Sequence, residues 1–113
     1  MKDPYWYKAK YVKAYDGDTV TLDIDLGFFT WIKDQTFRLY GIDTPELRGD
    51  ERVKGLEARD YVRSRLEKAT AIYVKTYKDT KGKYGRWLAD IYIDGENLNH
   101  TLIGLGYAVK YLP

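Results

Sequence analysis

Polar and apolar residues alternate along the first 42 positions, a pattern typical of β-strands with one buried face. Apolar residues alternate with Thr and Asp over residues 19–25, which predicts a half-buried strand. A similar alternation over residues 5–15 slips near Val12 and predicts a β-bulge there. A third strand is expected over residues 31–42. The first part of the chain is therefore predicted to be a three-stranded meander.

The hydrophobic period changes after Pro45. Residues 53–69 carry apolar side chains three and four positions apart, which predicts an amphipathic helix. The later elements are expected to be two strands, a short helix and an extended segment, over residues 72–77, 86–93, 96–105 and 107–112. The buried faces of the two helices are expected to consist of Ala58, Tyr61, Val62, Leu66 and Ala69 in the first and Leu98, Leu102 and Leu105 in the second.

The predicted order is β-β-β-α-β-β-α, within an α+β, mainly β, class. A helix between the third and fourth of five strands is the arrangement of a five-stranded OB barrel. A small α+β sheet packed on two helices is the alternative fold. The length of 113 residues favours a single domain over residues 1–113.

Composition excludes several kinds of catalytic site. The chain has no Cys, one His and one Ser, so thiolate chemistry, zinc fingers and His-cluster metal sites are ruled out. The net charge is only +2, but residues 75–86 hold five basic residues and one acid, a compact anion-binding candidate. Any catalysis is expected to use Asp, Glu, Arg, Lys, Thr or Tyr, with an oxygen-binding metal as an option.

No apolar stretch approaches the roughly 18 residues needed to cross a membrane, so no membrane partner is expected. The N-terminus lacks the apolar core of a signal peptide. Two compartments stay open: the cytoplasm for the chain as given, or the exterior if the chain is a mature form.

The meander brings distant polar residues to one end of the sheet. The turn at Asp18 and the end of the third strand at Asp43 lie at the same end, because the strands between them run down and up. A helix of about 17 residues spans roughly 25 Å and returns the chain to the other end. The fourth strand then runs back toward the end of the sheet that holds Asp18 and Asp43, and the basic segment that follows this strand lies at the same end. The residues expected at this end are Asp18, Asp43, Thr44, Glu46, Lys83, Tyr84 and Arg86.

These residue types together suit phosphodiester hydrolysis. Carboxylate oxygens and a backbone carbonyl suit Ca²⁺ or Mg²⁺, and arginines match phosphate oxygens. A further carboxylate, Glu46, could take a proton from water. Taken singly, each has a structural explanation: the Asp residues fit a turn, Arg38 fits an exposed strand face, and the basic loop fits a solvated hairpin.

Three segments carry a resemblance to a known family. Residues 16–20 (DGDTV), 37–46 (FRLYGIDTPE) and 83–86 (KYGR) resemble the signature segments of the staphylococcal nuclease family. Residues 55–58 (GLEA) resemble the start of that family's first helix. The similarity covers nearly all of residues 8–111, in the same order and with nearly the same spacing.

The resemblance implies an OB barrel and a Ca²⁺-dependent nuclease that hydrolyses DNA and RNA, leaving 3′-phosphates. Carried over by motif, Asp18, Asp43 and the Thr44 carbonyl match the Ca²⁺ ligands. Glu46 matches the general base or water-positioning residue. The remaining matches are two phosphate-binding arginines, Arg38 and Arg86, and three nucleotide-contacting residues, Lys83, Tyr84 and Tyr111. The substrate is expected to be single-stranded or frayed, with little sequence or sugar specificity.

The chain departs from the family pattern in three places. The connection from Glu46 to Gly55 is short, and the family's C-terminal helix is missing after Pro113. The hairpin between the second and third strands carries Phe28, Phe29 and Trp31, which would suit a packed plug, a dimer patch or a base-stacking surface.

Two rival functions follow. The first is a non-catalytic module of the same fold that binds single-stranded nucleic acid or protein. The second is an assembly subunit using the aromatic hairpin. A monomer is the first expectation, with a dimer through Phe28, Phe29 and Trp31 as the alternative.

Overall fold

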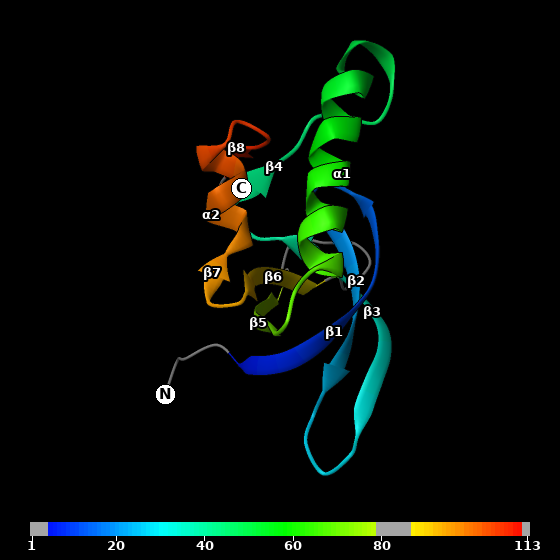
Figure 1. Cartoon of the computed structure of the whole chain (residues 1–113), viewed down its shortest axis with the longest axis vertical. Helices are drawn as coiled ribbons and strands as arrows, with labels where there is room; N and C mark the ends of the chain where they lie inside the picture. Colours follow the sequence, from blue (N-terminus) through cyan, green and yellow to red (C-terminus); the bar gives the residue numbers. More distant parts are fainter. Residues whose placement is uncertain (1–4, 79–86, 112–113) are drawn as a thin grey trace.

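The computed structural model describes residues 5–78 and 87–111. In chain order the elements are β1 (Trp6–Asp16), β2 (Thr19–Asp25), β3 (Trp31–Leu39), β4 (Ile42–Asp43), the 3₁₀ turn η1 (Gly49–Glu51), α1 (Arg52–Glu67), β5 (Ile72–Lys78), β6 (Trp87–Ile93), β7 (Glu96–Asn97), α2 (Leu98–Gly104) and β8 (Val109–Lys110). Strands predominate, and the two helices lie outside the sheet (Figure 1).

Five strands close into a barrel, which confirms the predicted OB arrangement. The sheet order is β3-β2-β1-β5-β6-β7, and a parallel pairing of β3 with β6 closes the circle. This seam is short and joins Phe37, Arg38 and Leu39 to Trp87, Leu88 and Ala89. All other pairings in the barrel are antiparallel.

The first strand lies between β5 and β2 in the sheet. Its residues 6–9 pair with β5, and residues 8–16 pair with β2 on the other edge. The register with β2 shifts between Tyr11 and Lys13, which confirms the bulge predicted near Val12, and shifts again between Ala14 and Asp16. Bulges increase the local bend and twist of a strand, as a closed barrel requires.

The barrel interior is filled by the apolar residues of the alternating strands. Val20, Leu22 and Ile24 are buried as the pattern predicts, together with Val74 and Ile91 from the opposite side. The longer helix covers one side of the barrel (Figure 1) and turns Ala58, Val62 and Leu66 toward it. Arg63 secures this helix because its guanidinium donates to the Ala14 carbonyl at 2.9 and 3.0 Å.

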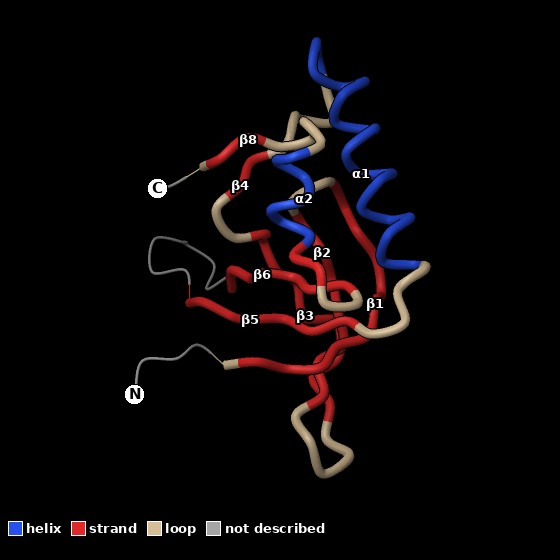
Figure 2. The backbone as a smooth tube through the Cα atoms, turned by 60° about the vertical axis from the view of Figure 1, so that its left-hand side comes forward, coloured by secondary structure: helices blue, strands red, loops and turns tan. Residues whose placement is uncertain are grey.

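Several predicted boundaries were wrong. The third strand ends at Leu39 rather than residue 42, because Gly41 adopts a left-handed φ of +77° before the short β4. The last helix begins at Leu98, capped by the Asn97 side chain, and residues 96–97 form β7 instead. Leu105 lies beyond this helix and is exposed, contrary to the expected buried face. Within the extended segment predicted over residues 107–112, the described strand is β8, which comprises Val109 and Lys110 and pairs with β4 (Figure 2).

The hairpin between β2 and β3 projects from the barrel end opposite the helices (Figures 1 and 2). Phe28 and Phe29 at its tip are 98% and 101% exposed, so the packed-plug interpretation is wrong. Both adopt left-handed backbone conformations, with φ of 55° and 59°, which are unusual for aromatic residues. Neither of the described helices is long and apolar enough to cross a membrane.

One buried amide holds the barrel seam together. Asn99 of α2 is fully buried, and its Oδ1 accepts from the Ile91 N–H at 3.2 Å. Its Nδ2 donates to the carbonyls of Tyr40 and Ala89 at 2.9 and 3.0 Å. A single side chain therefore connects α2, β6 and the end of β3 where the barrel closes.

The Asn99→Ala variant should be strongly destabilised, because it leaves three backbone groups at the seam without this partner. Each buried polar group left unpaired costs about 1–3 kcal/mol, and partial solvent entry limits the sum to about 2–4 kcal/mol. Urea unfolding would measure the loss. His100→Ala on the exposed side of the same helix is the control and should change stability by less than about 0.5 kcal/mol; equal effects for the two variants would contradict the role assigned to Asn99.

Candidate active site

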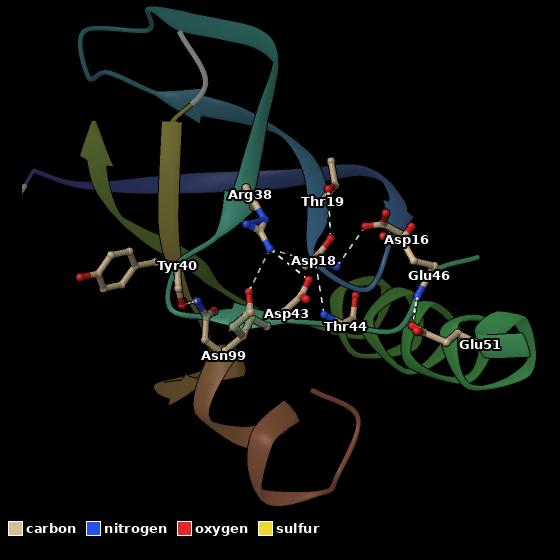
Figure 3. A network of polar contacts seen from close by, with 11 residues as sticks. Asp16, Asp18, Thr19, Arg38, Tyr40, Asp43, Thr44, Glu46, Glu51 and Asn99 are labelled. Atoms are coloured by element: carbon tan, nitrogen blue, oxygen red, sulfur yellow. Dashed lines mark hydrogen bonds and ion pairs between the residues drawn. The ribbon is translucent and has the colours of Figure 1, made fainter. Parts of the chain in front are cut away.

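A buried carboxylate, Asp18, lies where the β1–β2 turn meets the segment after β4 (Figure 3). Only 8% of the residue is exposed. Its oxygens accept from the Thr44 N–H and the Thr19 hydroxyl, both at 3.3 Å. Its own backbone carbonyl accepts from the Leu39 N–H at 2.8 Å. Asp18 thus connects β2, the end of β3 and the start of the loop that carries Thr44.

Arg38 of β3 reaches two acidic side chains at once. Its Nη2 lies 3.2 Å from Asp43 Oδ1 and 3.6 Å from Asp18 Oδ2 (Figure 3). The same nitrogen donates to the Ile42 carbonyl at 3.3 Å. The guanidinium also lies over the Tyr111 ring, 5.2 Å from its centre. A positive charge is therefore stabilised between these two carboxylates.

Two glycines allow the surrounding segments to approach closely. A Cβ on Gly17 would meet the Thr44 side chain at 2.9 Å and the Ala58 Cβ at 3.0 Å. A Cβ on Gly55 would clash with the backbone carbonyl of Glu46. These distances are far shorter than van der Waals contact, so α1 and the loop carrying Glu46 can approach only if Gly is retained at both positions.

Glu46 is positioned by the short connection before the helix. Its backbone N–H donates to Glu51 Oε1 at 3.0 Å, so a residue of the 3₁₀ turn η1 fixes the backbone of the loop at Glu46. Glu46 itself is exposed, and its charge is near enough to raise the pKa of Asp43. Figure 3 shows Glu46 at the same end of the barrel as Asp16, Asp18 and Asp43. We refer to these four residues as the acidic site.

Burial and neighbouring charges shift the pKa values of three carboxylates in the acidic site. Burial, and then the adjacent Asp18, raise the pKa of Asp16 to about 6. Partial burial and the Asp18 charge also raise the pKa of Asp43. Burial opposes the ionisation of Asp18, but hydrogen bonds from Asp16, Thr44 and Thr19 and the charge of Arg38 outweigh it and lower its pKa. The site therefore favours additional positive charge.

The donor set fits a hard cation such as Ca²⁺ or Mg²⁺. Within residues 5–78 and 87–111, no three acidic or imidazole side chains are grouped closely enough to hold a metal ion by themselves. Two carboxylates, from Asp18 and Asp43, stand on either side of a bound guanidinium, and both supply oxygen ligands. A metal here would need the Thr44 carbonyl or water for its remaining positions.

The remaining predicted site residues divide into two groups. Tyr111 lies beside Arg38, and its N–H donates to the Gly41 carbonyl at 2.8 Å. Lys83, Tyr84 and Arg86 lie outside the described residues, so their predicted roles stay predictions.

Sequence reasoning missed two residues of this region. Asp16 lies in the signature segment 16–20 but was given no site role, although its Oδ1 accepts from the Asp18 N–H at 3.1 Å. Its spacing of two from Asp18 was the available signal. Residues 98–99 resemble the family's later helix, but no role was predicted for Asn99, because nothing in the local pattern marks an Asn that will bridge two strands.

Comparison with known proteins adds independent information. The family model for staphylococcal nuclease homologues matches residues 36–112. The chain is 35% identical over 111 residues to the thermonuclease of Staphylococcus hyicus, covering 92% of the chain and 60% of that protein. It is 30% identical over 105 residues to the thermonuclease of Staphylococcus intermedius, covering 89% and 58%.

A third relative is an uncharacterized protein of Methanocaldococcus jannaschii, 29% identical over 130 residues, covering 94% of the chain and 60% of that protein. The chain thus spans about 60% of the length of these relatives.

The raised pKa of Asp16 predicts that the metal-free protein loses stability as the pH rises from about 4 to 6. The folded state binds the Asp16 proton more tightly than the unfolded state, so ionisation in this window favours unfolding. Asp16→Asn cannot ionise and should be more stable than wild type by about 1–2 kcal/mol at pH 7, a figure reduced for solvent screening.

Urea unfolding in EDTA at pH 4, 5, 6 and 7 would measure this difference. It should shrink as the pH falls to 4, where Asp16 is protonated in the folded state and only about half ionised in the unfolded state. Asp50→Asn, an exposed acid on η1, is the matched control and should show no such trend. A constant difference at all four pH values would contradict the interpretation.

Proposed function

Because the chain belongs to the staphylococcal nuclease homologues, we propose that it is a Ca²⁺-dependent nuclease that hydrolyses phosphodiester bonds of DNA and RNA. The observation that carries the proposal is the convergence of Arg38, Asp18 and Asp43 at one end of the barrel. Carboxylates that favour a cation and an arginine that fits phosphate are the parts such hydrolysis needs. The relatives are longer than this chain. The activity is therefore proposed from the residues that this chain itself contains.

Each residue has a distinct role in the proposed mechanism. Asp18, Asp43 and the Thr44 carbonyl would hold Ca²⁺, which when bound neutralises a phosphate oxygen and orients the attacking water. Glu46 accepts a proton from that water or positions it. Arg38 exchanges its carboxylate partners for phosphate oxygens and stabilises charge on the five-coordinate phosphorus, together with Arg86.

The residues proposed to contact the nucleotide belong to the end of the barrel that carries the acidic site. Tyr111 borders Arg38 and would stack on a nucleotide, while Lys83 and Tyr84 are proposed to contact it from the basic loop. The substrate is single-stranded or frayed DNA or RNA, and the products carry 3′-phosphates. Binding directed at phosphates rather than base edges gives little specificity and a strong dependence on salt.

Cleavage of single-stranded DNA and RNA should require Ca²⁺ and stop in EDTA. Glu46→Gln keeps the shape of the side chain but cannot accept a proton, so its cleavage rate should fall about 10²–10⁴-fold. The measurement is the rate of oligonucleotide cleavage with Ca²⁺, with Mg²⁺ and with EDTA. Glu57→Gln, an exposed change on α1, is the matched control and should retain the wild-type rate.

A folded protein that cleaves under none of these conditions, yet binds single-stranded DNA in EDTA, would replace the proposal with the non-catalytic binding module.

Arg38→Ala should affect cleavage and cation binding in opposite directions. Cleavage should fall about 10²–10³-fold, because a group that stabilises the transition state is lost. Ca²⁺ affinity without nucleotide should rise about 2- to 10-fold, since removal of a competing charge near Asp18 and Asp43 is worth about 0.5–1.4 kcal/mol.

Isothermal titration calorimetry would measure the Ca²⁺ affinity. Arg52→Ala, exposed at the start of α1, is the control and should leave both quantities unchanged. Weaker Ca²⁺ binding by Arg38→Ala would show that Arg38 does not compete for the carboxylates.

A further inference from the structure

Aromatic side chains and a lysine cover the outer surface of β1, β5 and β6. The antiparallel register places Trp6 opposite Lys75, and Tyr73 opposite Tyr92. Alternation along β5 turns Val74 into the core and leaves Lys75 and Tyr77 on the outside. We call the set Trp6, Tyr40, Lys75, Tyr77 and Tyr92 the aromatic face.

The members of the aromatic face contact one another in a continuous row. The rings of Tyr40 and Tyr77 stack with their centres 4.3 Å apart and an angle of 22°. The Lys75 ammonium lies 5.7 Å from the centre of the Tyr77 ring and 5.7 Å from that of Trp6. Trp6 in turn packs on Tyr92 at 5.0 Å. The row therefore crosses three strands without entering the core.

The barrel does not need this face for its own core. Trp6 is 52% exposed and Tyr40 is 36% exposed, while the interior is filled by other side chains. The Tyr77 hydroxyl donates to Asp90 at 3.0 Å, which fixes its ring and engages the acidic neighbour of Lys75. The face thus offers rigid planar rings next to a cation.

The aromatic face adjoins the proposed active site through the sheet. Arg38 pairs with Leu88 across the barrel seam, and Leu88 pairs with Tyr77. Two strand spacings separate Arg38 from Tyr77, or about 10 Å along the sheet. Tyr40 follows β3 directly after Leu39, and its ring stacks on Tyr77 (Tyr40 and Arg38 are labelled in Figure 3). The aromatic face therefore begins two residues from Arg38 along the chain.

We propose that the aromatic face binds the bases of a single-stranded nucleic acid next to the phosphate held at Arg38. Rings of this kind stack on any base, and an interleaved lysine attracts the backbone. OB folds bind about 4–16 nucleotides of single strand, which is more than the acidic site alone can contact. The inference rests on the proposed function for its ligand class, but it concerns binding and not cleavage.

Binding of fluorescein-labelled dT8 in EDTA tests this without cleavage. Fluorescence anisotropy should show that Trp6→Ala binds about 5- to 100-fold more weakly than wild type, as expected for the loss of one stacked base. Val53→Ala is the control, because it removes an exposed apolar side chain of α1, outside the aromatic face and the acidic site, and should bind like wild type. Circular dichroism confirms that each variant is folded.

A second variant separates charge from stacking and guards against a folding defect in Trp6→Ala. Lys75→Gln should reduce the slope of log affinity against log salt by about 1, because one phosphate contact is lost. Unchanged dT8 affinity in Trp6→Ala together with an unchanged salt slope in Lys75→Gln would overturn the proposal, and would indicate that the face serves another partner.

The kinetic readout distinguishes this inference from the proposed nuclease function. If cleavage occurs, Trp6→Ala should raise the KM for dT8 about 5- to 100-fold, with kcat and the cleavage of a dinucleotide unchanged. If no protein cleaves, the anisotropy result still decides whether the aromatic face binds. An equal loss on dT8 and on the dinucleotide would also overturn the proposal.

Discussion

The short parallel seam between β3 and β6 is the constraint on which the rest of this structure depends. It joins only three residues from each strand, and parallel pairs are less stable per residue than antiparallel ones. Asn99 strengthens it by satisfying backbone groups on both sides, and the Tyr40 N–H adds a bond to the Ala89 carbonyl at 2.8 Å. Without closure, Arg38 would lie on an open edge strand rather than beside Leu88.

Charged side chains are concentrated at the end of the barrel where the β1–β2 turn meets the end of β3. Asp18 is buried, and a buried carboxylate is tolerated only with partners. Those partners come from β2, β3 and the loop after β4, and the antiparallel β2–β3 pairing places Thr19 opposite Arg38. Burial and the neighbouring charge of Asp18 raise the pKa of Asp16 and of Asp43, so a cation bound beside them would favour their ionised forms.

The proposed phosphate binding at Arg38 and the proposed base stacking on the aromatic face take place on neighbouring parts of the barrel surface. Arg38 contacts the acidic site through its ion pairs, and the strand register places it two strands from Tyr77 of the aromatic face. Phosphate chemistry and base stacking are thereby about two strands apart, a spacing suited to a flexible single strand. The aromatic hairpin tip lies at the other end of the barrel and takes no part in this surface (Figure 1).

The sequence by itself determined the β-rich pattern, the buried residues of β2 and α1, the bulge in β1 and the motifs that hold Asp18, Arg38 and Asp43. These are local properties, set by side-chain period and by turn chemistry. Only the tertiary structure decided that β3 stops at Leu39, that Asn99 is buried and that Trp6 and Tyr77 lie on either side of Lys75 on the outer surface. The end of β3 follows from the left-handed φ of Gly41, which side-chain alternation does not mark. The other two depend on which strands and helices become neighbours, and those neighbours come from segments far apart in the chain.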